Sequence, residues 1–257
     1  MPAFHFDVHG SRLRGQWWQP DPGRLPIVLL HEGLGSLTQW RDFPERLAAA
    51  TAHPVFAFER RGHGGSSPLE APRQPDYLEA EAAFLWPTLD AAGIGRAILL
   101  GHSDGGSIAL LAAAAAPARV PALVTIAAHV FVEDKALAGI RAAQAAYPAG
   151  LRDRLMRHHG ANTDAMFAAW ADTWLAPGFR GWNVEERLAA ITSPALVMQG
   201  AEDEYGTPDQ VDAIGRHSGG FVWPCLLPGL RHQPHLEDPG RVLDEIAGFL
   251  AGTEGLR

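Results

Sequence analysis

A serine lies between two glycines where a buried strand is expected to turn into a helix. The stretch "AILLGHSDGGSIALL", residues 97–111, starts as an apolar run, continues as a helical pattern, and holds the spacing Gly101-x-Ser103-x-Gly105. A tight strand-to-helix turn projects the side chain at its apex clear of the sheet, and its compressed backbone requires small neighbours. The pattern predicts that Ser103 is an exposed nucleophile.

A serine hydroxyl becomes an effective nucleophile when a base removes its proton and an acid orients that base. In the fold that uses this turn, the acid and then the histidine follow the serine, each on a loop after a strand. Asp203 comes just after the apolar run 194–200, and both His232 and His235 follow the run 221–227. The order and placement predict serine hydrolase machinery.

The oxyanion formed when a serine attacks a carbonyl needs N–H donors. The backbone N–H of Asp104, the residue after the predicted nucleophile, is one expected donor, and the dipole of the following helix assists it. The loop after the apolar run 26–31 is expected to supply the second donor.

Two acidic residues, Glu32 and Asp104, flank this predicted oxyanion site. Because a free carboxylate would repel a developing negative charge, we expect the Asp104 side chain to point away and pair with Arg60, Arg61 or a loop amide. The alternative is that one of the two carboxylates holds a cationic or hydroxyl-bearing part of the substrate.

The elements that must position these residues are short apolar runs alternating with longer helical patterns. A leading hairpin is expected around Gly10 and Ser11. The later runs are continuously apolar, which is typical of parallel strands covered on both faces. Together they predict a doubly wound, mostly parallel sheet. The later strands are expected at 26–31, 54–59, 97–101, 122–128, 194–200 and 221–227. Helices are expected at 39–50, 76–92, 104–115, 208–217 and 239–251, the last with Asp238 as its N-cap.

One long stretch without strands interrupts the alternation. Residues 131–187 contain only helix-like segments, which predicts a helical cap inserted into a core of residues 1–130 and 188–257. The aromatic side chains of this cap favour an apolar or aromatic acyl or alcohol group. His129 follows the 122–128 strand and is expected either to open near the active site or to pack in the core. The predicted substrate contacts are Glu32, Leu34, His129, Trp170 and Trp174.

Several motifs in order along nearly the whole chain resemble those of serine hydrolases with the α/β-hydrolase fold. The resemblance implies a mostly parallel, eight-stranded sheet with helices on both faces and an inserted helical cap. The matching motifs are "LLHEGLGS" (29–36), "FERRGHGGSS" (58–67), "GHSDGG" (101–106), "GAEDEYG" (200–206) and "RHQPHLEDP" (231–239).

The resemblance also implies roles for the candidate residues. Ser103 matches the nucleophile, Asp203 the acid and His232 the base. His232 is preferred to His235 because the family usually places its histidine a few residues before an "H-x-E-x-P" tail. Arg231 departs from the glycine that usually precedes this histidine.

For the acid, the Gly-x-x-Asp spacing favours Asp203 over Glu202 and Glu204. Asp134 is the alternative, because some relatives place their acid after the strand that corresponds to 122–128.

The second oxyanion donor lies, by similarity, two residues after His31. That residue is Gly33, with Leu34 as the alternative. The family commonly has His-Gly at this point, whereas this chain has His31-Glu32-Gly33, so the donor loop is clearer than the donor residue.

Composition excludes several other classes of protein. The net charge of −8, without a block of like charges, argues against a nucleic-acid-binding surface. The N-terminus lacks a signal-peptide pattern and no apolar stretch reaches about 18 residues, so we expect a cytoplasmic protein that does not span a membrane. The single cysteine, Cys225, is expected to be a buried, inert thiol. No metal-binding or nucleotide-binding motif is present, so no metal and no cofactor are expected.

The most favoured function is hydrolysis of a small carboxylic ester through an acyl-enzyme. The same triad also serves carbon–carbon bond hydrolases and lactonases among relatives, and these stay alternatives. A serine at the turn argues against epoxide and haloalkane hydrolysis, where relatives carry aspartate. A non-catalytic ligand-binding protein is the alternative from another class. The sequence identifies neither the natural substrate nor the oligomeric state.

Overall fold

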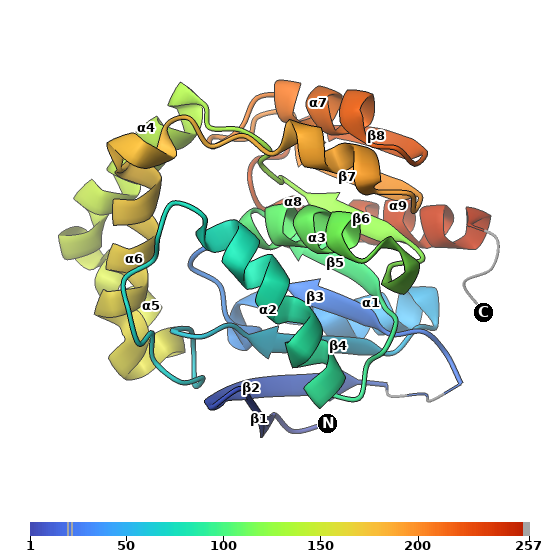
Figure 1. The fold of residues 1–257 in the computed structure, drawn as a ribbon, viewed down its shortest axis with the longest axis horizontal. Coiled ribbons are helices and arrows are strands. Elements are labelled where there is room, and N and C mark those ends of the chain that lie inside the picture. Colours follow the sequence, from blue (N-terminus) through green and yellow to red (C-terminus); the bar gives the residue numbers. More distant parts are fainter. Residues whose placement is uncertain (20, 22, 254–257) are drawn as a thin grey trace.

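The computed structural model describes residues 1–19, 21 and 23–253, which build a layered α/β structure around one sheet (Figure 1). Eight strands pair in the order β1-β2-β4-β3-β5-β6-β7-β8. The hairpin β1–β2 and the β2–β4 pair are antiparallel, and every later pair is parallel. This confirms the predicted mostly parallel sheet with a leading hairpin.

The strands agree with the apolar runs to within a few residues at each end. They are β1 (Phe4–Val8), β2 (Ser11–Trp18), β3 (Ile27–Leu30), β4 (Val55–Glu59), β5 (Ile98–His102), β6 (Leu123–Ile126), β7 (Ala195–Gly200) and β8 (Val222–Leu227).

The helices of the sheet layers also follow the predicted ranges. Helix α9 has the expected cap, since the Asp238 side chain accepts a hydrogen bond from the Arg241 N–H at 3.2 Å. These helices are α1 (Phe43–Thr51), α2 (Tyr77–Ala91), α3 (Asp104–Ala115), α7 (Asp209–His217), α8 (Pro234–Glu237) and α9 (Pro239–Gly252), with short turns η1 (Leu37–Trp40), η2 (Pro117–Arg119) and η6 (Glu185–Ala190).

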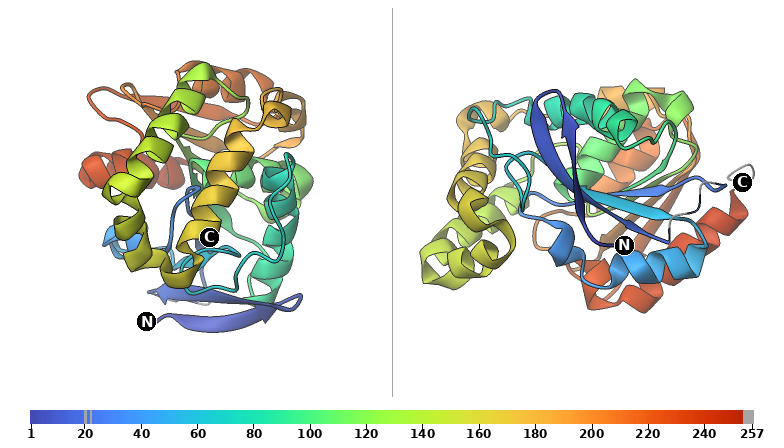
Figure 2. Two further views of the ribbon diagram at one scale, coloured as in Figure 1. Left: turned by 90° about the vertical axis from the view of Figure 1, so that its left-hand side faces the viewer. Right: turned by 90° about the horizontal axis from the view of Figure 1, so that it is seen from below.

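Helices cover both faces of the sheet, with α2 and α3 on one side and α1 and α9 on the other (Figure 2). Alternate residues of a strand point to opposite faces. In β3, Val28 and Leu30 therefore pack toward α2 and α3, whereas Ile27 and Leu29 pack toward α1 and α9. This two-sided burial explains why the central strands are continuously apolar.

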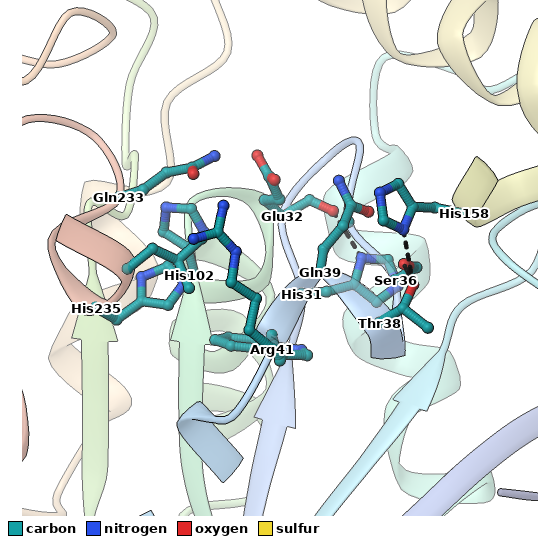
Figure 3. A pocket seen from close by; sticks show the side chains of 13 residues that line it. His31, Glu32, Ser36, Thr38, Gln39, Arg41, His102, His158, Gln233 and His235 are labelled. Atoms are coloured by element: carbon teal, nitrogen blue, oxygen red, sulfur yellow. Dashed lines mark hydrogen bonds between the residues drawn. The ribbon is translucent and has the colours of Figure 1, made fainter. Parts of the chain in front are cut away.

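The carboxyl ends of the central strands carry polar side chains. His31 directly follows β3 and His102 ends β5, and both lie at the edge of a pocket (Figure 3). In open α/β sheets this edge is where ligands bind.

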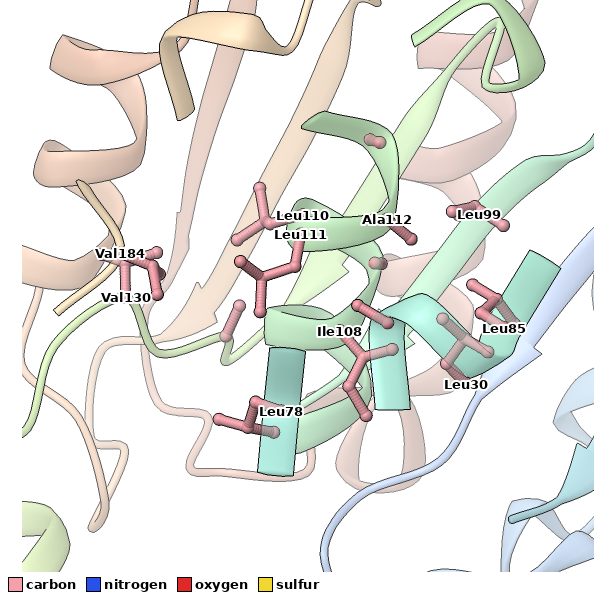
Figure 4. Close-up of a cluster of buried hydrophobic side chains, with 14 of the residues drawn as sticks. Leu30, Leu78, Leu85, Leu99, Ile108, Leu110, Leu111, Ala112, Val130 and Val184 are labelled. Carbon is pink, nitrogen blue, oxygen red and sulfur yellow. The ribbon is translucent and has the colours of Figure 1, made fainter. Parts of the chain in front are cut away.

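Helix α3, which starts at the predicted nucleophile, is held by apolar packing along its length. Ile108, Leu110 and Leu111 lie among side chains from the sheet and from α2 (Figure 4). Its first ten residues are all buried, so the turn that precedes it has a rigid support.

A long helical segment separates β6 from β7. It contains α4 (Asp134–Ala146), α5 (Arg152–His159) and α6 (Thr163–Leu175), joined by η3 (Tyr147–Leu151) and η4 (Gly160–Asn162) and followed by η5 (Pro177–Phe179). An isolated antiparallel bridge pairs Phe131 with Asn183 and brings the two ends of the segment together. In Figure 1 these helices stand beside the sheet rather than over either of its faces.

The last strand departs from the expectation of two-sided burial. β8 is one of the two edge strands, and Trp223 and Leu226 are 54% and 43% exposed. Cys225 is half-buried rather than fully buried, so the expectation of a buried thiol was wrong. An edge strand has a neighbour on one side only, and a run of apolar letters does not distinguish it from a central strand.

Within the described residues, no helix is both long and apolar enough to cross a membrane.

Candidate active site

Ser103 occupies a strained turn between β5 and α3. Its backbone has φ 53° and ψ −121°, a region that residues with a side chain rarely adopt and that costs on the order of 1–3 kcal/mol. The flanking glycines are sterically required. A Cβ on Gly105 would overlap the carbonyl of Leu30, and one on Gly101 would overlap the backbone of Gly105. Strained, well-supported residues cluster at functional sites, which fits a nucleophile here.

Two loops at the same edge of the sheet bring the predicted acid and base together. His232 Nδ1 donates to Asp203 Oδ1 at 2.8 Å, and both side chains are buried. The carboxylate also accepts the backbone N–H of Tyr205 at 2.8 Å, which fixes its orientation. Because Nδ1 carries the proton in this bond, Nε2 of a neutral His232 is left as a proton acceptor. Ser103 and His232 line the same cleft.

The charges of this pair are mutually supporting. Burial alone would lower the pKa of His232, but the hydrogen bond to Asp203 and the charges of Asp203, Glu32 and Glu204 raise it above its usual value. Burial would raise the pKa of Asp203, and the hydrogen bond and charge of His232 more than offset this, so that pKa is lowered. The pair is therefore suited to hold an imidazolium next to a carboxylate.

The main chain of His232 is held from both sides. Its N–H donates to Glu204 Oε2 at 3.1 Å, and its carbonyl accepts from His102 Nε2 at 2.8 Å. Glu204 thus contacts the histidine loop rather than acting as the orienting acid. The sequence offered Glu204 only as an alternative acid, and nothing in its spacing pointed to a contact with a main-chain N–H.

The alternative triad members lie elsewhere. His235 is buried against Trp40 and Phe43, and no described carboxylate bonds its ring. Asp134 is an exposed residue that pairs with Arg180. Glu202 is exposed on the loop after β7.

Three main-chain N–H groups in or next to the cleft that Ser103 lines are candidate oxyanion donors. Within the described chain, the main-chain N–H groups of Gly33, Leu34 and Asp104 donate to no protein acceptor. Asp104 opens α3, so its N–H has no partner within the helix. Gly33 lies against the indole of Trp170, which any Cβ at this position would overlap. Steric need thus explains a glycine at position 33.

The Asp104 side chain points away from the cleft, as expected, but its partner is a different residue. Tyr77 Oη donates to Asp104 Oδ2 at 2.7 Å, and Trp174 Nε1 donates to Tyr77 Oη at 2.6 Å. The Arg60 guanidinium instead donates to the carbonyls of His31 and Glu32, and among the described residues Arg61 makes no hydrogen bond to this carboxylate. The expected pairing with an arginine or a loop amide was wrong, because sequence separation hid the approach of α2 and α6 to the turn.

The cleft above Ser103 has a volume of about 480 Å³, and we call it the serine lobe. Its wall comes from the loop after β3, from the histidine loop and from the long helical segment. Among the predicted substrate contacts, Glu32, Leu34 and Trp170 line it; further lining side chains are Ala143, Leu151, Leu155, Arg41 and Tyr205.

Two predicted substrate contacts do not line this lobe. Trp174 is 2% exposed and bonds Tyr77, and His129 is 3% exposed with its Nε2 3.2 Å from the Tyr205 carbonyl. The ring centroids of His129 and His232 lie 6.2 Å apart, and His129 does not line the cleft, so it packs next to the His–Asp pair outside the cleft. Both residues belong to the core that supports the site.

Arg41 is a cleft residue that the sequence did not single out. It lines the serine lobe, and its backbone has φ 53° and ψ −126°, close to the values at Ser103. No carboxylate of the described residues lies within ion-pair distance of its guanidinium. Its position depends on the turn that ends η1, which has no signature in the local sequence.

Among the described residues, no group of three or more His, Cys, Asp or Glu is arranged to hold a metal ion.

The sheet order, the strained serine turn and the His–Asp pair on successive loops define an α/β-hydrolase-type protein. A family model described as alpha/beta hydrolase fold matches residues 26–179, and the chain belongs to this family.

Similar proteins include named hydrolases. Serine hydrolase BPHL of Homo sapiens is 28% identical over 241 residues, covering 89% of this chain and 79% of that protein. Esterase YbfF of Escherichia coli (strain K12) is 28% identical over 261 residues, covering 93% and 98%. The solved structure of a thermophilic esterase from Thermogutta terrifontis has the same fold, with a TM-score of 0.77 at 20% identity over 98% of this chain and 99% of that one.

Proposed function

We propose that this protein hydrolyses small carboxylic esters through a covalent acyl-enzyme, with Ser103, His232 and Asp203 as its triad. The observation that carries the proposal is the pairing of His232 Nδ1 with Asp203 in the cleft that Ser103 lines from its strained turn. That pairing leaves Nε2 free to accept the serine proton.

In the first half of the reaction, Ser103 Oγ attacks the ester carbonyl carbon while His232 Nε2 takes the hydroxyl proton. The carbonyl oxygen becomes an oxyanion that the N–H groups of Gly33 and Asp104 stabilise. Collapse of this intermediate breaks the bond to the alcohol oxygen, which takes the proton from His232 and leaves. Asp203 holds the ring in one tautomer and stabilises the imidazolium.

In the second half, water replaces the alcohol. His232 takes one proton from the water as its oxygen attacks the acyl carbon, and returns it to Ser103 Oγ as the acyl–oxygen bond breaks. The carboxylic acid leaves and the enzyme is regenerated. Residues 131–187 act as a cap whose apolar side chains, including Leu151, Leu155 and Trp170, contact the substrate from above Ser103.

The name of one similar protein supports an ester, and the name of another supports hydrolysis by a serine without indicating the substrate. One relative is named an esterase and another a serine hydrolase. Carbon–carbon bond hydrolysis and lactone opening use the same machinery and are tested as rivals, as is ligand binding without turnover.

The test measures turnover of chromogenic esters of increasing acyl length, together with labelling by a fluorophosphonate probe. We expect Ser103→Ala to lose at least about 10⁴-fold in kcat and to escape labelling. Ser218→Ala, which removes a hydroxyl outside the cleft, serves as the matched control and keeps both.

Labelling of Ser103 without turnover of any ester would favour the carbon–carbon hydrolase or the lactonase. A folded protein that neither turns over esters nor reacts with the probe would favour the ligand-binding protein.

A further inference from the structure

A second cavity of about 360 Å³ adjoins the serine lobe, and we call it the histidine lobe. Glu32, Gln39, Arg41, Gln233 and Leu236 line both cavities, so the two share one boundary. Figure 3 shows side chains from distant parts of the chain gathered around it. The side chains that give this lobe its character are His31, His102, His158, His235, Trp40 and Thr38.

The imidazoles of this lobe are neutral near pH 7. Burial lowers the pKa of His235 to about 3, aided by the nearby His232. Burial, with the neighbouring His235 and His232, also lowers the pKa of His102 well below its usual value. Burial, and then the charge of Arg60, does the same for His31. A histidine-rich cavity would ordinarily suit an anion, but these rings bring no positive charge.

Several polar atoms in the lobe have no partner among the described residues. His235 Nδ1 and Gln39 Oε1 are buried and make no hydrogen bond. The whole His235 residue is only 3% exposed. His102 Nε2 donates to a carbonyl, so Nδ1 of the neutral ring is an acceptor. An unpartnered buried polar atom costs free energy, and a ligand that supplies the missing partner recovers it.

The boundary between the lobes carries one charge of each sign. Glu32 and Arg41 are its only ionisable members, and the two cavities share both residues. Their opposite charges give no net preference for a cation or an anion. Unpartnered acceptors beside neutral imidazoles and amides instead suit groups that both donate and accept, which is the property of hydroxyls.

The position of the lobe decides which part of an ester would enter it. Gln233, which follows His232 in the chain, and Leu236 line both lobes, so the histidine lobe adjoins the part of the serine lobe that holds the base that protonates the leaving alcohol in the proposed mechanism. The apolar side chains of the helical segment line only the serine lobe. An apolar acyl group therefore fits the serine lobe, and the alcohol fits the histidine lobe.

We propose that the histidine lobe binds the alcohol portion of the substrate and that this alcohol carries free hydroxyl groups in addition to the esterified one. His235 and Gln39 are the residues that recognise these hydroxyls. The inference rests on the proposed ester hydrolysis and narrows it to esters of polyhydroxylated alcohols.

The test compares three esters of one acyl group: propyl butyrate, glycerol 1-monobutyrate and choline butyrate. We expect kcat/KM for the glycerol ester to exceed that for the propyl ester by roughly tenfold. His235→Phe and Gln39→Leu remove the polar atoms and keep similar volumes. Each is expected to lower kcat/KM for the glycerol ester by roughly three- to tenfold, through KM, and to affect the propyl ester less, so that the ratio of kcat/KM for the glycerol ester to that for the propyl ester falls.

Gln144→Leu, on an exposed face of α4 outside both lobes, is the matched control and alters neither ester. His235→Phe alters a buried residue and can lower the stability of the protein. Gln39 is only half-buried, so Gln39→Leu tests the same inference without that effect.

Each other outcome overturns the inference in a distinguishable way. Equal turnover of the propyl and glycerol esters, or a glycerol preference that survives both substitutions, overturns it and leaves ester hydrolysis standing. A preference for the choline ester assigns the lobe to a cation instead. Absence of turnover with all three esters, together with absence of fluorophosphonate labelling, removes the proposed function and this inference together.

Discussion

Around His232 the charges are arranged to favour its protonated form. Asp203 bonds the ring, and Glu204 bonds the main chain of the same residue. Glu32 bonds neither, yet its charge also raises the pKa of His232. Glu32 is itself desolvated, which raises its own pKa, while the positive charge of His232 lowers it. The charge of Glu32 thus raises the pKa of His232 although the two residues share no hydrogen bond.

Replacing Glu32 is expected to move the pH dependence of catalysis. In the proposed mechanism His232 acts as a base only when neutral, so activity should be lost as the pH falls through its raised pKa. Glu32→Gln removes one of the charges that raise this pKa, and the acidic limb of the kcat/KM profile should therefore shift to lower pH. Profiles of wild type and variant on one neutral ester measure the shift.

Glu202→Gln provides the matched control, since Glu202 is exposed and is not among the main charges acting on His232. Its acidic limb should coincide with that of wild type. A limb that stays in place in Glu32→Gln, or moves to higher pH, would contradict the electrostatic role.

At the residue scale, the sequence predicted the members of the His–Asp pair because their order and their places after strands follow from the fold. It did not predict the Tyr77 bond to Asp104 or the histidine lobe. Tertiary packing brings Tyr77 to Asp104 in the hydrogen bond, and brings Gln39 and His235 to the wall of one cavity. Contacts between such distant positions leave no local pattern in a single sequence.

At the level of single elements, the turn between β5 and α3 depends on glycines that other chain segments approach closely. Gly105 meets the carbonyl of Leu30, and Gly106 meets Ala128. These contacts connect the turn that holds Ser103 to β3 and to the loop after β6, so the turn cannot relax without moving its neighbours. The stability of the fold and the geometry of the site are linked here.

Gly105→Ala is expected to destabilise the protein by about 1–3 kcal/mol or more, because the new methyl group overlaps the Leu30 carbonyl. Gly215→Ala is the matched control. Gly215 lies within α7 with open space where a Cβ would be, so alanine should stabilise by about 0.5–1 kcal/mol. Urea denaturation measures both changes, and effects of the same sign would refute the steric explanation.

The same apolar runs that predicted the central strands misjudged the last one. In β5 every residue is buried, whereas in β8 Trp223 is more than half exposed. A hydrophobic run shows that its side chains prefer apolar surroundings. Whether neighbouring elements bury those side chains depends on where the strand lies in the sheet. The strand order is a property of the whole sheet.

Across the whole molecule, one buried hydrogen-bonded chain connects the helical segment to the nucleophile turn. Trp174 in α6 donates to Tyr77 in α2, which donates to Asp104 at the start of α3. These residues are buried, so each polar atom depends on the others for its partner. Hydrogen bonds thereby connect the helical segment to Asp104, whose N–H is a proposed oxyanion donor.

This chain should appear as thermodynamic coupling. Tyr77→Phe and Trp174→Phe are each expected to lower the free energy of unfolding by about 1–3 kcal/mol, and their effects should be non-additive by about 0.5–3 kcal/mol. A double-mutant cycle in urea measures the coupling. Trp86 lies elsewhere on α2, and its indole N–H donates to the Ala112 carbonyl on α3. The effect of Trp86→Phe on the free energy of unfolding should therefore add to that of Tyr77→Phe without coupling. Additive effects for the Tyr77 and Trp174 pair would argue against a connected chain.

The bridge between Phe131 and Asn183 has an evolutionary consequence. It holds the two ends of the intervening helices side by side, at one point between β6 and β7. The entropy of closing a loop grows only slowly with its length, so the fold tolerates longer, shorter or rearranged inserts between these ends. Exchange of the segment between these ends as a module would leave the strands that precede Ser103, Asp203 and His232 in register. New substrate preferences would then arise by replacing one contiguous stretch of gene, without rebuilding the reaction centre.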